Sequence, residues 1–227
     1  ISVAIENKNL AKEAIRQERV KKELELASQM QNMLLPTQLP QDEHLDIAAF
    51  YKSHQQVGGD YYDVIWVNKI EIAMCIADVS GKGVSAAILM SNFQANLQAG
   101  VKHSISLPEL VQDLNEKVIN NAKGEKFITM FIAVYNVENR QLTYINCGHN
   151  PPVLKNGNQI VQLKDGCPGL GMLDYLPAPK IGMVDIQPES TLVTYTDGLC
   201  EVENHEKIEF WTNRIENAQT IITGGSF

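Results

Sequence analysis

The spacing of the apolar residues changes at two prolines, and this change limits the chain to a helical arm followed by a β-rich domain. Residues 3–35 contain no Gly or Pro and are rich in Ala, Glu, Lys, Gln and Leu, which are good helix formers. Pro36 and Pro40 end this segment, because proline lacks a backbone N–H and clashes with the preceding helical turn. From Asp46 onward the apolar runs are short and β-rich, and Gly-Gly and Asn-Lys pairs separate them, as expected between strands.

Within the arm, one stripe of residues has the alternating four- and three-residue spacing that is typical of a coiled-coil seam. The stripe consists of Val20, Leu24, Ala27, Gln31 and Leu34. Farther upstream the same register meets polar and charged residues, so the seam is weaker there. We expect residues 1–36 to form a regulatory or linker helix. The sequence leaves two alternatives open: a coiled coil that makes a homodimer, and a helix that packs on its own domain.

The β-rich part contains paired strand-like runs and two consecutive helix-like runs. Expected strands span 46–54, 60–68, 70–79, 127–137, 141–148, 152–155, 159–163, 184–187 and 191–197. Expected helices span 84–100, closed by Gly100, and 107–122, with Pro108 near its start. Paired strands with two helices inserted between them predict a largely antiparallel sheet with helices packed outside it, an α+β layered domain.

The charge distribution argues against a nucleic-acid surface. The formal net charge is −8, and residues 1–40 hold six of the 19 Lys/Arg and five of the 27 Asp/Glu. The excess acid therefore lies in the β-rich domain, where it repels phosphate backbones and suits cation binding. No apolar stretch approaches the roughly 20 residues of a membrane span, and the charged start does not resemble a signal peptide. We expect a cytoplasmic protein, with no nucleic-acid or membrane partner for this segment.

Three short motifs place an aspartate beside glycines at the end or start of an expected strand. They are GGDYYD at 58–63, ADVSGKG at 77–83 and TYTDG at 194–198. Carboxylates that converge from separate strand ends provide the oxygen ligands that Mg²⁺ or Mn²⁺ requires. Two such ions about 3.5–4 Å apart can activate a water and hold a phosphoryl group for in-line attack. Asp-Gly is also a common turn pair, so each motif taken alone also fits an ordinary turn.

Six motifs occur in one order along the chain: GGDYYD, ADVSGKG, FITMFIAVY, CGHNPP, PGLG and YTDGLCE. Together they resemble the metal-dependent 2C-type (PPM) Ser/Thr phosphatases, in their bacterial SpoIIE/RsbU-type branch. The resemblance covers about residues 30–210 and assigns residues 37–227 to a phosphatase domain. It implies a four-layer α-β-β-α sandwich of two antiparallel sheets flanked by helices, preceded here by the long N-terminal helix.

The resemblance also implies a set of metal ligands. Asp60 matches the family's first metal-binding aspartate, and Asp78 matches the aspartate that bridges both ions. The backbone carbonyl of Val79 matches the ligand beside it, and Asp197 matches the metal-binding aspartate of the Asp-Gly motif. Asp60, Asp78 and Asp197 would therefore act in catalysis through two bound divalent cations, Mn²⁺ or Mg²⁺.

Residues around these ligands are expected to support the phosphate or the loops. Gly59, Gly81 and Gly83 lack a Cβ, so their backbone can approach a ligand closely and keep the loops thin. Lys82 either attracts the phosphate or is simply solvated. Residues 84–122 match the pair of switch helices that, in similar proteins, reposition to assemble the metal site.

The function implied by the resemblance is hydrolysis of phosphoserine or phosphothreonine on a protein by a metal-activated water. The SpoIIE/RsbU-type branch implies a phosphorylated STAS-type anti-anti-sigma factor as substrate, in a partner-switching signal-transduction pathway. The N-terminal ISVAIENKNL looks like the closing helix of a GAF sensor domain, so the arm would relay the state of an upstream sensor. His149 in the CGHNPP motif is expected to hold its turn, with a general acid as the alternative.

The sequence departs from the family pattern near its end. The family continues past the Asp-Gly motif to a DDxT strand that contributes a further metal-ligating aspartate. Here no acidic residue follows Glu216 before the last residue, Phe227. We therefore expect a phosphatase domain that is incomplete at its C-terminus. The alternatives are a non-catalytic pseudophosphatase that binds a phosphoprotein, and a chain that serves mainly as a dimerisation and relay element.

Overall fold

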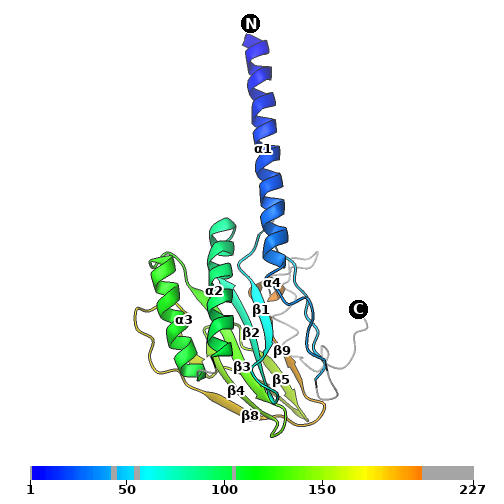
Figure 1. The fold of residues 1–227 in the computed structure, drawn as a ribbon, viewed down its shortest axis with the longest axis vertical. Helices are drawn as coiled ribbons and strands as arrows, with labels where there is room; N and C mark the ends of the chain where they lie inside the picture. Colours follow the sequence, from blue (N-terminus) through cyan, green and yellow to red (C-terminus); the bar gives the residue numbers. More distant parts are fainter. Residues whose placement is uncertain (1, 42–44, 54–56, 104–105, 201–227) are drawn as a thin grey trace.

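The protein is a long helix attached to a layered α+β domain (Figure 1). The structure, a computed structural model, describes residues 2–41, 45–53, 57–103 and 106–200, and the side chains of residues 6–199 within these ranges. The helices are α1 (Ser2–Asn32), α2 (Val84–Lys102), α3 (Leu107–Ala122) and α4 (Asp197–Cys200). The strands are β1 (Tyr61–Trp66), β2 (Glu71–Val79), β3 (Ile128–Asn136), β4 (Gln141–Cys147), β5 (Val153–Asn156), β6 (Gln159–Gln162), β7 (Gly166–Cys167), β8 (Gly182–Asp185) and β9 (Thr191–Val193).

The strands form a large sheet and a small one. In the large sheet the order is β1-β2-β3-β4, all antiparallel, and the outer edge of β4 is shared by β8 and β7. Only the two-residue β7 pairs in parallel in the described part of this sheet. The small sheet has the order β6-β5-β9 and is antiparallel throughout. Consecutive long strands are joined directly except between β2 and β3, where α2 and α3 are inserted.

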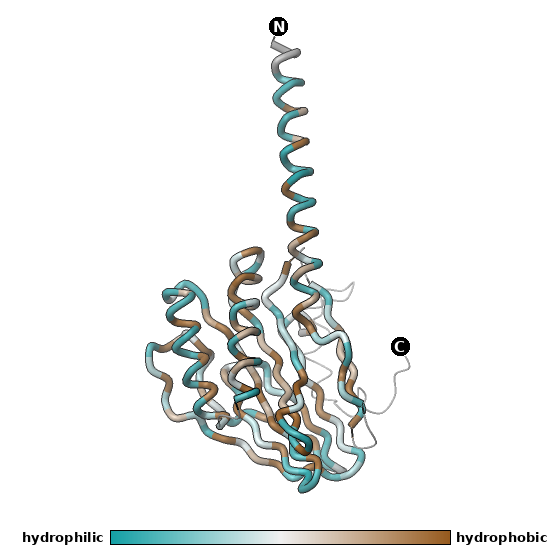
Figure 2. Tube along the Cα trace, viewed as in Figure 1, coloured by the Kyte–Doolittle hydropathy of each residue, from teal (hydrophilic) through white to brown (hydrophobic). Residues whose placement is uncertain are grey.

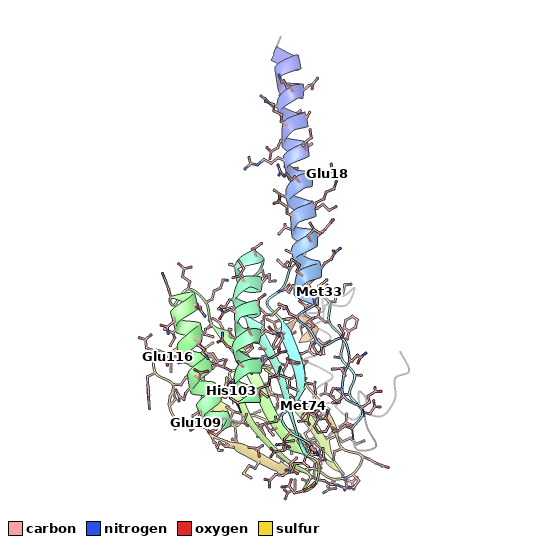
Figure 3. The ribbon with its side chains drawn as sticks, viewed as in Figure 1. Glu18, Met33, Met74, His103, Glu109 and Glu116 are labelled. Atoms are coloured by element: carbon pink, nitrogen blue, oxygen red, sulfur yellow. The ribbon has the colours of Figure 1, made fainter. Side chains whose placement is uncertain are left out.

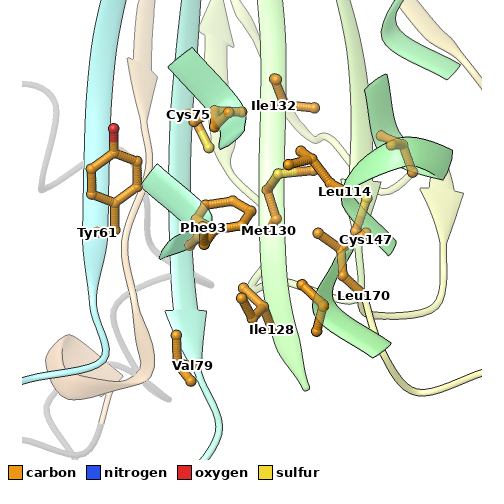
Figure 4. Close-up of a cluster of buried hydrophobic side chains, with 14 of the residues drawn as sticks. Tyr61, Cys75, Val79, Phe93, Leu114, Ile128, Met130, Ile132, Cys147 and Leu170 are labelled. Atoms are coloured by element: carbon orange, nitrogen blue, oxygen red, sulfur yellow. The ribbon is translucent and has the colours of Figure 1, made fainter. Parts of the chain in front are cut away.

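The central strand β3 shows how the layers are held together. Its side chains point alternately to the two faces of the sheet. Ile128, Met130 and Ile132 belong to the apolar cluster beneath α2 and α3, whereas Phe131 and Ala133 belong to a second cluster against the small sheet. Figure 4 shows the first cluster, in which side chains from both helices lie over the strands. Both faces of β3 are therefore buried.

Helix α3 begins and ends where the sequence predicts, because its first residues satisfy their own backbone groups. The hydroxyl of Ser106 accepts a hydrogen bond from the Glu109 N–H, and the Glu109 carboxylate accepts one from the Ser106 N–H. Leu110, Leu114 and Val118 then recur at helical spacing, and all three are buried against the sheet.

Helix α2 extends two residues beyond its predicted end at Gly100. The glycine is buried inside the helix, and the N–H of His103 donates to the Ala99 carbonyl at the true end. Glycine serves close packing here instead of ending the helix, so the sequence-based boundary at this position was wrong.

One strand prediction was wrong throughout its described residues, and two were wrong in part. Residues 46–53 form no strand and pair with no described strand, and Phe50 there is 89% exposed. The strand predicted at 191–197 stops at Val193, and the one predicted at 184–187 runs from Gly182 to Asp185. The short parallel strand β7 was not predicted, since two residues are too few for a periodic pattern.

The expected fold class is confirmed: two largely antiparallel sheets, packed helices and a preceding long helix. Helices α2 and α3 cover the outer face of the large sheet, giving three of the four expected layers (Figure 1). The helical layer expected on the outer face of the small sheet lies outside the described residues.

Most of α1 projects from the domain. Figure 2 shows the projecting part as largely hydrophilic with scattered apolar positions, and Figure 3 shows its side chains directed outward. Leu10, Ile15 and Val20 are 64%, 70% and 49% exposed. Exposed ion pairs such as Arg19–Glu23 stabilise such a helix only slightly. Among the described residues, no helix is both long and apolar enough to cross a membrane.

Truncating Leu114 tests the packing of α3 on the sheet. Leu114 is 1% exposed, so Leu114→Ala should lower the free energy of unfolding by about 2–5 kcal/mol through lost burial and a residual cavity. Ile88→Ala on the neighbouring helix is the matched control, because Ile88 is 66% exposed, and its effect should stay within about 0.5 kcal/mol. Chemical denaturation measures both, and equal midpoints for the two variants would contradict this packing.

Candidate metal site

The register of β1 on β2 brings two carboxylates face to face. Tyr61 pairs with Ala77 in this antiparallel ladder. One residue farther along, Asp60 lies opposite Asp78, and the two side chains are hydrogen-bonded to each other. Like charges in such a position destabilise a sheet. The sequence therefore folds into a structure that opposes two acidic groups at one sheet edge.

Burial and mutual repulsion change the protonation of this pair. Burial, the Asp60 charge and the hydrogen bond to Asp60 together raise the pKa of Asp78 to about 8, and the Asp197 charge adds to this. Burial also raises the pKa of Asp60, although the hydrogen bonds from Asp78 and Thr196 oppose the increase. The raised pKa of Asp78 favours retention of a proton by the pair near neutral pH. A cation between the two oxygens would replace that proton.

The donor chemistry of the pair fits a hard divalent cation. Carboxylate oxygens and a backbone carbonyl are the ligands that Mg²⁺ and Mn²⁺ prefer. Within the described residues, no group of three or more His, Cys, Asp or Glu side chains lies close enough to hold a metal ion. The structure thus provides a two-carboxylate core for the site, and Asp197 does not join it in a three-residue cluster.

Gly59 brings the backbone of its loop into contact with the end of β2. The carbonyl of Gly59 accepts a hydrogen bond from the Val79 N–H at 3.4 Å. A Cβ on Gly59 would lie 2.8 Å from the Val79 carbonyl oxygen and 3.2 Å from Oδ1 of Asp78. Only glycine fits at this distance, and the approach of this backbone to a ligand stays a prediction.

Asp197 lies far from Asp60 and Asp78 in the sequence, and its charge acts on both of them. It is the first residue of α4 and is exposed, four residues after β9 ends, so its predicted place at a strand end was wrong. The hydroxyl of the preceding Thr196 donates to Oδ2 of Asp60 at 3.2 Å. Tyr195 is buried, and its hydroxyl donates to the Pro151 carbonyl at 3.3 Å. The CGHNPP turn therefore holds the segment that carries Asp197.

The loop after Asp78 is kept thin by glycines with left-handed backbone. Gly81 and Gly83 have φ angles of 83° and 81°. A Cβ on Gly81 would lie 2.7 Å from the ammonium nitrogen of Lys126, which donates to the Ser80 carbonyl at 2.9 Å. Lys82 is exposed, and the structure records no ion pair for it among the described residues. Both alternatives for Lys82 stay predictions.

His149 has the environment of a structural residue. It is 4% exposed, its N–H donates to Oδ1 of Asn146 at 2.7 Å, and Nδ1 lies 2.9 Å from the Thr129 hydroxyl. Burial lowers the pKa of His149 to about 4, against smaller opposing effects of the Tyr195 backbone and Asp197. The imidazole is therefore neutral at pH 7, which favours the role of holding the turn over that of a general acid.

Two residues near the pair were missed by the sequence analysis. Burial and the charges of Asp60 and Asp78 raise the pKa of Tyr51 to about 12. Its phenol oxygen is buried without a hydrogen-bond partner among the described residues, close to Gly58. Lys126, two residues before β3, donates to the Ser80 carbonyl of the loop after Asp78. Neither lies in a recognisable motif, and only the fold brings them to the site.

Comparison with known proteins shows the family to which the chain is similar. The profile of the Stage II sporulation protein E (SpoIIE) family matches residues 69–224, a range that includes Asp78 and Asp197 but not Asp60. Phosphoserine phosphatase RsbU of Bacillus subtilis (strain 168) is 39% identical over 135 residues, which are 60% of this chain. The chain spans only 40% of the length of that relative.

Solved structures show the same fold. The SiaA-PP2C domain of Pseudomonas aeruginosa has a TM-score of 0.74 at 20% identity, covering 89% of this chain and 82% of that chain. RsbX in complex with magnesium has a TM-score of 0.55 at 20% identity, covering 77% of this chain and 84% of that chain. The fold described above is therefore that of 2C-type phosphatase domains.

Adding one methyl group at Gly59 tests the close approach at the site. Gly59→Ala should weaken Mn²⁺ binding about 10- to 100-fold, the cost typical of disturbing the surroundings of a metal ligand, because the loop must move away from the Val79 carbonyl. Gly124→Ala is the control for adding a methyl group in a loop, since a Cβ on Gly124 meets nothing within 4 Å, although Gly124, unlike Gly59, has a positive φ of 78°. Isothermal titration calorimetry measures both, and unchanged affinity in Gly59→Ala would exclude the Val79 carbonyl from the site.

The proton shared by the pair predicts a pH dependence of the metal-free protein. Between the ordinary carboxyl pKa of 3.8 and about 8, folded Asp78 holds a proton that the unfolded chain releases. This carboxyl therefore makes the folded state less stable as the pH rises through that interval.

Asp78→Asn removes the titrating group. In EDTA its melting temperature should rise relative to the natural chain as the pH increases from about 5 to about 8.5. Asp174→Asn, at an exposed position, should show no such trend. Differential scanning calorimetry measures the difference, and a constant difference across this range would contradict the paired-carboxylate description.

Proposed function

The chain belongs to the SpoIIE family of 2C-type phosphatases, and we propose that it is a metal-dependent serine/threonine protein phosphatase. The observation that carries this proposal is the half-buried pair of Asp60 and Asp78, which face each other at one end of the β1–β2 ladder. Such a pair is unfavourable for stability alone, and a phosphatase of this class requires it to hold cations.

Four groups of the chain would hold two divalent cations, Mn²⁺ or Mg²⁺. They are the carboxylates of Asp60, Asp78 and Asp197 and the backbone carbonyl of Val79. When bound, the cations supply an activated water and positive charge for the phosphoryl group. Asp78 must lose the proton that it shares with Asp60, and Asp197 must approach the pair from the start of α4. The magnesium bound in the structure of RsbX supports this class of ion.

The neighbouring loops would place the phosphate. Gly59, Gly81 and Gly83 allow the backbone to pass close to the ligands, as the contacts of Gly59 and the φ angles of the other two indicate. Lys82 is exposed on the loop after Asp78, where its ammonium group can attract a phosphate from solvent. Lys126 supports the same loop through the Ser80 carbonyl.

The substrate we propose is a phosphorylated STAS-type protein in a partner-switching pathway. The similar protein RsbU is named as a phosphoserine phosphatase, which supports phosphoserine as the bond that is cleaved. Residues 1–36 would form the linker from an upstream sensor domain of GAF type, and residues 37–227 the phosphatase domain. The exposed apolar positions of α1 support a homodimer through this helix.

The second candidate is a pseudophosphatase that binds a phosphoprotein without cleaving it. It is favoured by the absence of a three-carboxylate cluster in the part of the chain that the structure describes. The two candidates differ in one measurable property, because both bind the phosphorylated partner but only the enzyme releases phosphate from it.

Phosphate release from a phosphoserine STAS protein tests the enzyme directly. The chain should release phosphate in Mn²⁺ and not in EDTA. Asp78→Asn should lower the rate by more than about 100-fold, beyond the range seen when only outer groups around a metal are changed. Asp174→Asn is the matched control and should keep full activity. No Mn²⁺-dependent release, together with retained binding of the phosphoprotein, would favour the pseudophosphatase.

A further inference from the structure

Gln31, at the end of the arm, is attached directly to the loop that carries Asp60. Its amide N–H donates to the Gly58 carbonyl at 2.7 Å, and its amide oxygen accepts from the Gly58 N–H at 3.0 Å. Gln31 is 6% exposed, although the neighbouring Met30 and Met33 are 70% and 76% exposed. The amide of Gln31 offers a donor and an acceptor side by side, so this one side chain pairs both backbone groups of Gly58.

The loop at 58–60 is held from two sides. On one side the Gly59 carbonyl accepts the Val79 N–H at the end of β2. On the other side Gly58 is bound to Gln31 of α1, 27 residues earlier in the chain. Asp60 follows two residues after Gly58 and is already close to Asp78. A shift of Gly58 therefore moves Asp60 relative to its partner carboxylate.

Packing around the end of the arm is open on one side. A groove of about 540 Å³ lies between the segment that follows α1, strand β1 and helix α2, and its lining includes Leu34, Trp66 and Gln98. Leu35, just beyond the helix, is buried in the core. The end of the arm is thus fixed by Leu35 and by the two hydrogen bonds of Gln31, and side chains do not fill the space beside it.

The same face of α1 carries the predicted coiled-coil stripe. Gln31 follows Val20, Leu24 and Ala27 at seam spacing, but here its amide faces its own domain. A second helix paired along the whole stripe would compete with Gly58 for this amide. A second helix paired only along the upper part, where Val20 is 49% exposed, would leave the two bonds intact. The length over which α1 pairs with a second helix can therefore decide whether Gln31 stays bound to Gly58.

We infer that Gln31 is a positioning residue, which holds the Gly58 backbone and through it keeps Asp60 opposed to Asp78 for cation binding. The inference rests on the proposed metal-dependent phosphatase and identifies the point at which the arm regulates its metal site. Movement of the last turn of α1 lowers the affinity for the cation, and return of the amide to Gly58 restores it.

Mn²⁺ titration of the whole chain by calorimetry tests this role without an activity assay. Gln31→Met removes both hydrogen bonds at nearly constant volume, and the Kd for Mn²⁺ should rise about 10-fold or more. Gln31→Glu keeps an acceptor for the Gly58 N–H but loses the donor, so its Kd should lie in between. Gln17→Met is the matched control, because Gln17 lies two heptads upstream on the same stripe and is exposed; its Kd should equal that of the natural chain.

A second readout separates positioning from general stability. At saturating Mn²⁺ the kcat of Gln31→Met should match that of the natural chain, whereas its melting temperature in EDTA should fall, because both backbone groups of Gly58 lose their partner. Equal Kd values for all four proteins would overturn the role of Gln31 while leaving the phosphatase intact. A lower EDTA melting temperature with an unchanged Kd would assign Gln31 to stability only. Failure of the natural chain to bind Mn²⁺ at all would overturn both this inference and the proposed function.

Discussion

The antiparallel pairing of β1 with β2 is the constraint on which the rest of the site depends. Once Tyr61 pairs with Ala77, the next residues, Asp60 and Asp78, must face each other. Burial and the charge of Asp60 raise the pKa of Asp78 to about 8, so that a proton kept on Asp78 partly relieves the repulsion. Such an arrangement costs stability in the metal-free fold and is useful only if something positive takes the place of the proton.

Three distant parts of the chain converge on this opposed pair. The end of α1 holds Gly58 through Gln31, the end of β2 holds Gly59, and Thr196 donates to Asp60 from the segment before α4. Each contact is between polar groups at an element's end, beyond the apolar clusters that join the layers. The core thus fixes the sheet and its register, and the hydrogen bonds at the edge fix the loops. The loops of such a site can therefore shift while the core of the domain stays folded.

The sequence predicted the elements with long periodic patterns and failed where tertiary contacts decide. Helix α3 was predicted at its correct bounds because its cap and apolar face lie within the helix itself. Gly100 misled the prediction for α2, since burial and not helix ending explains that glycine. Asp60 and Asp78 were chosen as candidates from their motifs, and the structure brings them together. Tyr51 and Gln31 were not predicted to lie near the site. Tyr51 stands in an apolar run and Gln31 in a helical stripe, and only their contacts in the folded chain show that they are close to the pair.

The most direct test of the central claim is the position of a bound cation. Crystals grown with Mn²⁺ and measured at the manganese absorption edge would show the ion as an anomalous peak. We expect at least one peak within coordination distance of both the Asp60 and Asp78 carboxylates, beside the Val79 carbonyl. A peak elsewhere with Asp60 and Asp78 still sharing a proton, or no peak at a Mn²⁺ concentration that supports phosphate release, would contradict the assignment of this pair as the metal centre.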